Sequence, residues 1–367
     1  MDRQIKKIII EEGAGDFKLS EKILKKFAHI PVRRGSFESR NDLSFKGAAY
    51  MDMDKKTLRL IHFKGEFLKP CPGTKGYICC GYQILNVGTN CPMNCSYCIL
   101  QAYFNKPSLR IFVNLEKELD NIGEIIDSHP EKIFRIGTGE FTDSLALDHI
   151  TGWSELLTAF FSNKQNVVLE LKTKTDNIEG LLASPYRDRV IVSWSLNSTD
   201  ISASEEHGAV SIKKRLEAAK RCQEEGYIVS FHFDPLIYYN DWENGYLKTV
   251  EMLDRYIDPK RVIWVSMGCL RYVPALKSII RKRYPDTHIL DGEFINALDG
   301  KMRYFKPIRL EMYSLIKEYL DKWYNDLGLY LCMESSDTWI NSFGWSPEDS
   351  DGLSGYLDKR VIKIFLN

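Results

Sequence analysis

Six short runs of mainly apolar residues recur from about residue 82 onward, separated by longer amphipathic stretches. The runs cover 82–88, 132–139, 167–174, 190–197, 228–237 and 262–270. Repetition of strand, helix and strand predicts a parallel sheet with right-handed crossovers. Almost continuously apolar strands are typical of a sheet that is covered on both faces. We therefore expect an α/β protein whose chemistry lies at the carboxyl ends of barrel-like parallel strands.

Further elements are predicted around these strands. A helix over 201–226 would bury Leu216, Ala219 and Cys222 on one face and stop at Gly226. The other predictions are a strand over 5–10, a helix over 19–27, a helix over 308–326, a strand over 329–334, a loop over 341–355 and a last strand over 360–367. We expect a mixed N-terminal region at 1–75, the barrel at 76–285 and a C-terminal extension at 286–367 that completes the substrate site.

Composition narrows the functional classes. The 367 residues hold 50 basic and 50 acidic side chains, which argues against a general polyanion binder but leaves room for a local basic patch. No apolar stretch is long enough to cross a membrane, and the start does not resemble a signal peptide. We expect a cytoplasmic protein, in which clustered cysteines indicate metal binding rather than disulfides.

The stretch "CPMNCSYC" places Cys91, Cys95 and Cys98 in one expected loop after the first strand of the barrel. Structural zinc normally takes four ligands, so a zinc site would need a distant fourth group. Simple burial as small apolar side chains is common for cysteine but does not suit thiols beside polar residues in a loop. Three thiolates also suit an iron–sulfur cluster with one open iron. Tyr97 would shield such a cluster and pack on a bound base.

This motif, placed after the first of six strand–helix units, resembles the signature of the radical SAM superfamily. The resemblance implies a partial (β/α)6 TIM-like barrel with N- and C-terminal extensions. It also implies a 4Fe-4S cluster whose open iron binds S-adenosylmethionine (SAM). One electron then cleaves SAM to a 5′-deoxyadenosyl radical, while the protein positions the parts.

Residues at the strand ends match the SAM-binding part of that resemblance. In "GTGE", Gly139 allows close backbone approach and Glu140 would pair with the ammonium group of SAM; the alternative is a turn closed by a capping acid. Lys174 would bind the carboxylate, or simply be solvated. Ser195 and Asn197 would offer hydrogen bonds. The strand-end residues expected at the cofactor site are Gly139, Glu140, Lys174, Ser195, Asn197 and Asp234.

Between about 71 and 304 the chain more closely resembles the spore photoproduct lyase family, DNA-repair enzymes that reverse a thymine dimer. The matching stretches include "FVNLEKEL", "TDSLALDHI", "LKTKTDNIEGLL", "SWSLNS" and "DWENGY". The resemblance implies a donor cysteine after the second strand and a tyrosine after the last cluster cysteine. This chain has Glu140 and Ile99 there. The familiar hydrogen-atom relay is therefore expected to be absent, with Tyr97, Tyr103 and Cys269 as candidate catalytic residues.

Other cysteines leave a question open. Cys71, Cys79, Cys80 and Cys332 lie outside the cluster motif. A second cluster or redox chemistry is one interpretation, and apolar packing is the commoner one for adjacent cysteines.

Damaged DNA is the partner that the resemblance implies. Cations and aromatics in "RKRYP" and "KMRYFKPIR" would bind phosphates and stack a base, although such runs are usually solvated. The expected contacts are Arg271, Arg281, Lys282, Arg303, Tyr304 and Lys306. The electron would come from a donor such as flavodoxin or ferredoxin. The alternatives are a tRNA, peptide or metabolite substrate, or a non-catalytic metal protein.

Overall fold

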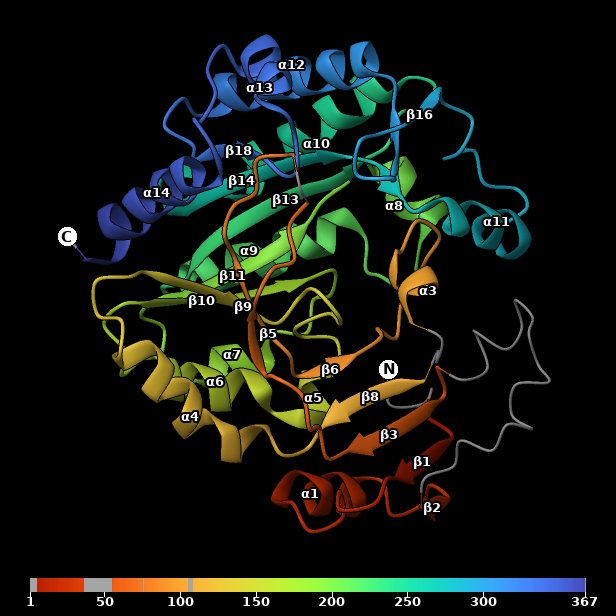
Figure 1. Cartoon of the computed structure of the whole chain (residues 1–367), viewed down its shortest axis with the longest axis vertical. Helices are drawn as coiled ribbons and strands as arrows, with labels where there is room; N and C mark the ends of the chain where they lie inside the picture. Colours follow the sequence, from red (N-terminus) through yellow and green to blue (C-terminus); the bar gives the residue numbers. More distant parts are fainter. Residues whose placement is uncertain (1–4, 36–54, 75, 105–107, 367) are drawn as a thin grey trace.

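The computed structural model describes residues 5–35, 55–74, 76–104 and 108–366. Its centre is an eight-stranded sheet in the order β18-β14-β13-β11-β10-β9-β5-β4 (Figure 1). Every neighbouring pair is parallel except β4 with β5. The strands are β4 (Leu68–Pro70), β5 (Gln83–Leu85), β9 (Phe134–Gly137), β10 (Val167–Thr173), β11 (Val190–Ser195), β13 (Ile228–Leu236), β14 (Val262–Cys269) and β18 (Leu329–Leu331). All six predicted barrel strands are confirmed, as is the strand predicted over 329–334.

Helices cover the sheet, and the sequence period explains how they attach. In α4 (Leu115–Asp127), Leu115, Leu119, Ile122 and Ile126 are buried at three- and four-residue spacings. The other main covering helices are α6 (Trp153–Phe161), α7 (Glu179–Ala183), α9 (Ile212–Glu224), α10 (Trp242–Tyr256) and α12 (Lys306–Trp323). Figure 1 shows α4, α6 and α7 beside β9 and β10, and α12 beyond β14 and β18. Across the described ranges, each helix is too short or too polar to span a membrane.

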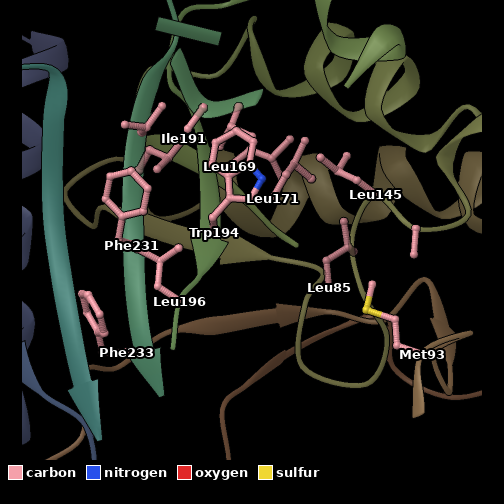
Figure 2. Close-up of a cluster of buried hydrophobic side chains, with 14 of the residues drawn as sticks. Leu85, Met93, Leu145, Leu169, Leu171, Ile191, Trp194, Leu196, Phe231 and Phe233 are labelled. Carbon is pink, nitrogen blue, oxygen red and sulfur yellow. The ribbon is translucent and has the colours of Figure 1, made fainter. Parts of the chain in front are cut away.

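The apolar core is densest around β10, β11 and β13. Leu169, Leu171, Ile191, Trp194 and Phe231 are all almost inaccessible to solvent, and Figure 2 shows them in one cluster. Burying large side chains of this kind supplies the main free energy of folding, at about 25 cal/mol for each Å² removed from water. The rigid strands then hold the polar residues at their ends in fixed positions.

A buried polar network lies among the strands. Glu170 Oε1 accepts hydrogen bonds from Ser193 (2.6 Å), Ser230 (2.8 Å), His232 Nε2 (2.9 Å) and Trp264 Nε1 (3.1 Å). Burial alone would raise the pKa of Glu170, but His232 and the hydroxyl donors hold it well below its usual range. The ionised form of this buried carboxylate is therefore favoured, because one of its oxygens collects four hydrogen-bond partners.

A second sheet at the N-terminal side has the order β2-β1-β3-β8-β6. The strand and helix predicted over 5–10 and 19–27 are confirmed by β1 and α1. This layer is formed by β1 (Lys7–Ile10), α1 (Lys18–Lys26), β2 (Val32–Arg34), β3 (Thr57–Ile61), β6 (Gly88–Thr89) and β8 (Leu109–Phe112). Because β6 and β8 come from beyond residue 75, the N-terminal layer continues past the predicted boundary. The division at 75 and 285 stays a prediction, and its residues 1–4, 36–54 and 75 lie outside the described ranges.

The single helix predicted over 201–226 is wrong. The segment forms α8 (Thr199–Glu205), the short strand β12 (Glu206–His207) and then α9, with Gly208 between them at φ +84°. β12 pairs with β7 (Asn94–Cys95) in the cysteine loop, and the Ser211 hydroxyl caps the new helix start at Lys214 N. A pairing distant in sequence overrides the local helical pattern. Gly226, in the left-handed region, is the predicted stop.

The C-terminal tail also differs from its prediction. The expected loop and strand are instead α13 (Ser336–Phe343), α14 (Ser350–Val361) and a π-helical turn (Ile362–Leu366). The Asp349 carboxylate accepts a hydrogen bond from Gly352 N (2.8 Å) and starts α14. Leu353, Leu357 and Val361 then form one buried face at four-residue spacing. The glycines and serines that suggested a loop are tolerated because this face is anchored.

Candidate active site

The cysteine loop follows β5 and β6 and ends in the short helix α3 (Leu100–Tyr103). Gln101 organises it, because its Nε2 donates to the carbonyls of Cys95 (3.1 Å), Ser96 (2.9 Å) and Cys98 (3.2 Å). Ser96 N also donates to Glu205 O (2.9 Å) beside the β7–β12 pair. The loop is thus fixed on both sides by residues outside the cysteine motif.

The three thiols of the motif share this loop and influence one another. Cys95 is buried, while Cys91 and Cys98 are partly exposed. Burial, then the Asp143 carboxylate, raises the pKa of Cys91 to about 12, against the opposing effect of Lys55. Burial and Glu206 raise the pKa of Cys95 further, and Lys174 opposes them. Two lysines therefore stand where they favour thiolates once a metal replaces the protons.

These residues fit a 4Fe-4S cluster with an open iron, since the loop offers three thiols, flanking cations and partly exposed outer cysteines. In such a cluster each thiolate binds a different iron. Across the described residues, no three Cys, His, Asp or Glu side chains are grouped closely enough for one metal ion. That statement covers Cys71, Cys79, Cys80 and Cys332 as well as the loop.

Tyr97 and Lys174 lie over the same loop. The Tyr97 hydroxyl donates to Glu206, which also pairs with the buried Arg215 guanidinium. Lys174 Nζ lies 6.0 Å from the centre of the Tyr97 ring. Burial, with Glu206 next, raises the pKa of Tyr97 well above its usual range. The hydroxyl is thus engaged by the protein, and the ring is the part of Tyr97 that faces the lysine.

Glu140 is held at the rim by a lysine that the sequence prediction missed. Lys172 Nζ lies 3.0 Å from Glu140 Oε1, and both side chains are partly exposed. Although burial opposes it, Glu140 and then Glu170 raise the pKa of Lys172 well above its usual range. The signal was present in β10, where Glu170 and Lys172 alternate with apolar residues and so share one face of the strand.

The two glycines before Glu140 are required by close packing. A Cβ at Gly137 would lie 1.4 Å from the Tyr82 hydroxyl oxygen, and one at Gly139 would lie 2.9 Å from Lys172 Cβ. The capping role in this turn belongs to Asp143, whose Oδ1 accepts from Leu145 N (3.0 Å) and Ala146 N (2.8 Å). Glu140 is therefore directed at Lys172 and is not the capping acid of the turn.

The remaining predicted cofactor residues make contacts within the protein. Asn197 donates through Nδ2 to Pro235 O (3.0 Å) and accepts from the Tyr246 hydroxyl (2.6 Å). Ser195 is buried and its carbonyl accepts from Arg215 (2.9 Å). Asp234 pairs with both terminal nitrogens of Arg271, at 3.0 and 3.2 Å. Their roles toward SAM stay predictions, and in this structure each supports a strand end.

Two of the predicted catalytic side chains lie in contrasting places. Cys269 is buried, with its sulfur 3.9 Å from Met312 Sδ and its amide donating to the Tyr313 hydroxyl (2.7 Å). Tyr103 is 61% exposed and stacks on Phe141 at 6.0 Å between ring centres. The first is enclosed by the protein and the second stands on its surface.

Two of the predicted nucleic-acid contacts disagree with the structure. Arg303 is buried and pairs with Asp299 (2.7 Å), so it cannot reach a phosphate. Tyr304 is also buried, stacked on Phe294 at 4.4 Å, so it cannot stack a base. Both residues lie in β17 (Met302–Tyr304). This is the middle strand of a small antiparallel sheet, between β15 (Arg271–Tyr272) and β16 (Phe294–Asn296).

The other predicted nucleic-acid contacts stay open to test. Arg281 and Lys282 are exposed on α11 (Pro274–Arg283). Lys306 is partly exposed and pairs with Asp337. Arg271 is occupied by Asp234, as described above. Only the α11 pair therefore presents freely exposed cations among these four.

A protein-family model described as "Spore photoproduct lyase" matches residues 6–326, most of the chain. The chain belongs to the spore photoproduct lyase family. The predicted family is thereby confirmed.

Spore photoproduct lyase of Bacillus subtilis (strain 168) is 28% identical over 209 residues, which cover 56% of this chain and 61% of that one. The lyase of Clostridium acetobutylicum is 23% identical over 313 residues, 84% of this chain and 91% of the relative. A third lyase, from Geobacillus sp. (strain Y412MC61), is 26% identical over 206 residues, 55% of this chain and 60% of its own. The match thus spans about three fifths of the Bacillus and Geobacillus relatives.

Solved structures of spore photoproduct lyase share the fold. A lyase complexed with dinucleoside spore photoproduct aligns with a TM-score of 0.77 at 22% identity, covering 89% of this chain and 98% of that one. A double mutant of the lyase with bound AdoMet and the same dinucleoside aligns with a TM-score of 0.79, covering 90% and 99%. The predicted partial barrel of parallel strands is confirmed by this likeness and by the strand order.

Proposed function

We propose that this protein is a radical SAM enzyme of the lyase type that acts on a DNA photoproduct. The observation that carries the proposal is the three-thiol loop, fixed by Gln101 and the β7–β12 pair, within the family match over 6–326. Support for the substrate comes from the relative that was solved with dinucleoside spore photoproduct. The proposal includes a cytoplasmic location and an electron donor such as flavodoxin or ferredoxin.

Cys91, Cys95 and Cys98 would hold the 4Fe-4S cluster. When bound, the cluster supplies the electron that cleaves SAM to methionine and a 5′-deoxyadenosyl radical. Glu140 would accept the ammonium group of SAM, for which it must share its carboxylate with Lys172. Lys174, beside Tyr97, would attract the carboxylate of SAM. The Tyr97 ring would shield the cofactor from water while its hydroxyl stays bonded to Glu206.

The lesion chemistry in this proposal differs from that of the better-known lyases. Glu140 and Ile99 stand where the resemblance implies the donor cysteine and its partner tyrosine. Neither a carboxylate nor an alkyl group is a sensible donor of a hydrogen atom in that relay. The proposal is therefore a photoproduct lyase with a different hydrogen-atom donor.

Anaerobic reconstitution with iron and sulfide tests the proposal. The protein, given SAM and dithionite, should form 5′-deoxyadenosine, and adding dinucleoside spore photoproduct should yield the repaired dinucleotide. Cys222→Ala, in α9 and remote from the cysteine loop, is the matched control and should behave like the parent. A preparation that binds iron yet never cleaves SAM would contradict the proposal.

A second candidate is radical SAM chemistry on a tRNA, a peptide or a metabolite. It is favoured by the burial of Arg303 and Tyr304, which removes two expected DNA contacts. The ion pairs Glu140–Lys172 and Asp234–Arg271 also give the strand ends a charged character. SAM cleavage that the dinucleoside neither stimulates nor couples to repair would favour this candidate.

A further inference from the structure

A strap of chain, defined as residues 71–74 and 76–82, joins the two edges of the barrel sheet. It leaves the end of β4, reaches β18 and returns to β5, as Figure 1 shows in orange. Ile78 forms an antiparallel bridge with Glu334, and its amide donates to the Glu334 carbonyl (2.9 Å). The Cys79 amide donates to Ser350 Oγ (3.0 Å). The strap therefore closes the side of the barrel between β5 and β18.

Three cysteines occupy neighbouring segments of this closure. Cys71 follows β4 and its amide donates to Tyr82 O (2.8 Å), in register with the β4–β5 pair. Cys80 lies two residues after Ile78 on the returning segment. Cys332 lies two residues before Glu334 at the carboxyl end of β18, where its amide donates to Met267 O (2.9 Å). Cys80 and Cys71 both act electrostatically on the Cys332 thiol, so the three thiols lie in one neighbourhood.

The same end of the sheet carries Glu140, Asp234 and Arg271. Arg271 Nη2 lies 3.8 Å from Cys332 Sγ while it also pairs with Asp234. The Glu140 carboxylate is close enough to act on both Cys71 and Cys80. Cys79 differs, because its sulfur packs against the carbonyl of Tyr77 and the turn at Gly73. The group of interest is therefore Cys71, Cys80 and Cys332.

Burial favours the protonated form of all three thiols. Burial, followed by Glu140, raises the pKa of Cys71 to about 11. Burial also raises the pKa of Cys80, against the effect of Arg135. Burial raises the pKa of Cys332 well above its usual range, although Arg271 opposes it. Thiols used as nucleophiles have lowered pKa values. A protonated thiol, in contrast, carries the hydrogen atom that a carbon radical abstracts.

We propose that Cys71, Cys80 and Cys332 form the hydrogen-atom donor of this chain, in place of the cysteine that Glu140 replaces. This inference rests on the proposed radical function. The carbon radical of the product takes a hydrogen atom from one S–H bond, which gives a C–H bond and a thiyl radical. One electron from the protein donor and one proton from water then restore the thiol. Cys269 is a poorer candidate, because Met312 and Tyr313 enclose it.

Deuterium transfer tests the proposal directly. The reconstituted enzyme in D2O, with exchanged thiols, should place deuterium in the product made from dinucleoside spore photoproduct. The variant Cys71→Ala/Cys80→Ala/Cys332→Ala should still cleave SAM, while deuterated product falls at least about tenfold. Cys222→Ala should resemble the parent. Single alanine variants, checked for iron content and circular dichroism, cover the case in which the triple variant does not fold.

The outcomes separate this inference from the function on which it rests. A parent protein that does not cleave SAM sinks the proposed function. A triple variant that keeps the parent's deuterium transfer overturns the donor assignment alone.

A readout without any cofactor uses the folded protein and iodoacetamide. Alkylation of Cys71, followed by peptide mass spectrometry, should rise with pH up to about 11, the pKa set by its burial. Alkylation that already stops rising at about pH 8.5, the pKa of an ordinary thiol, would contradict the proposed protonated donor.

Discussion

Glu140 occupies a position where two demands meet. Its carboxylate pairs with Lys172 at 3.0 Å, and the proposed function gives it the ammonium group of SAM. The positive charge of Lys172 is also stabilised by Glu170 and Asp234, so it does not depend on Glu140 alone. A cationic ligand can therefore be accepted beside the lysine without leaving a buried charge unpaired.

Glu140→Ala should weaken SAM binding by about ten- to a hundredfold, the loss expected for one hydrogen bond to a charged group. Iron content should not change, because Glu140 lies outside the cysteine loop. Isothermal titration of SAM into reconstituted protein measures the affinity. Glu225→Ala, which removes an exposed carboxylate paired with Arg187, is the control. An unchanged affinity for Glu140→Ala would exclude it from the SAM site.

Cys95 is the buried member of the three-thiol loop. Cys95→Ala should abolish stable cluster binding. The two remaining thiolates, from Cys91 and Cys98, would leave two of the four irons without a protein ligand. Iron and sulfide analysis after anaerobic reconstitution measures the effect. Alanine variants of the two partly exposed cysteines of the loop, Cys91 and Cys98, should give the same result. Cys222→Ala should keep its iron. Full iron content in Cys95→Ala would remove the basis of the proposed function.

At the scale of elements, apolar runs and a glycine predicted the strands and the helix end that depend on local sequence. The six apolar runs predicted six of the eight strands in the central sheet, whereas the short edge strand β4 was not predicted. Gly226 ended α9 where a left-handed residue is needed. The failure over 201–226 involves a partner distant in sequence. Glu206 leaves the helical pattern to pair with Cys95 in the other short strand. Arg303 and Tyr304 are covered by Asp299 and Phe294, which no periodicity in their own strand reveals.

The C-terminal helix α14 depends on its N-cap residue, Asp349. Asp349→Ala should lower the free energy of unfolding by about 0.5–2 kcal/mol, the usual cost of losing an N-cap. Urea unfolding followed by circular dichroism measures it. Asp351→Ala, a change within the first turn that leaves the cap in place, should cost less. Equal losses in the two variants would argue against the capping role of Asp349.

At the scale of the whole molecule, one buried negative charge links four strands of the central sheet. Glu170 collects donors from three neighbouring strands, so β11, β13 and β14 are tied to β10 by side chains as well as by their backbones. The sequence of β10 contains the alternating polar residues Glu170 and Lys172, but it does not reveal that one oxygen accepts four hydrogen bonds. That arrangement depends on the curl of the sheet, which brings the side chains together.

Stability should therefore fall in acid. The folded-state pKa of Glu170 lies below its unfolded value of 4.5, so its contribution is complete above that pH and is lost as the pH falls toward the folded-state pKa. Urea midpoints between pH 7 and pH 3 measure this. Glu170→Gln should be less stable at pH 7 and should show a smaller loss in acid. Parallel pH profiles for parent and variant would contradict the role of Glu170.

The bridge between Ile78 and Glu334 also sets an order of assembly. During synthesis the strap emerges early, but its partner strand is among the last parts of the chain to be made. Until that part of the chain is made, this edge of the N-terminal half stays uncovered, together with Cys71, Cys79 and Cys80 of the strap. A nascent chain halted before β18 should react readily with alkylating reagents at those sulfurs, and completion of the chain should slow that reaction.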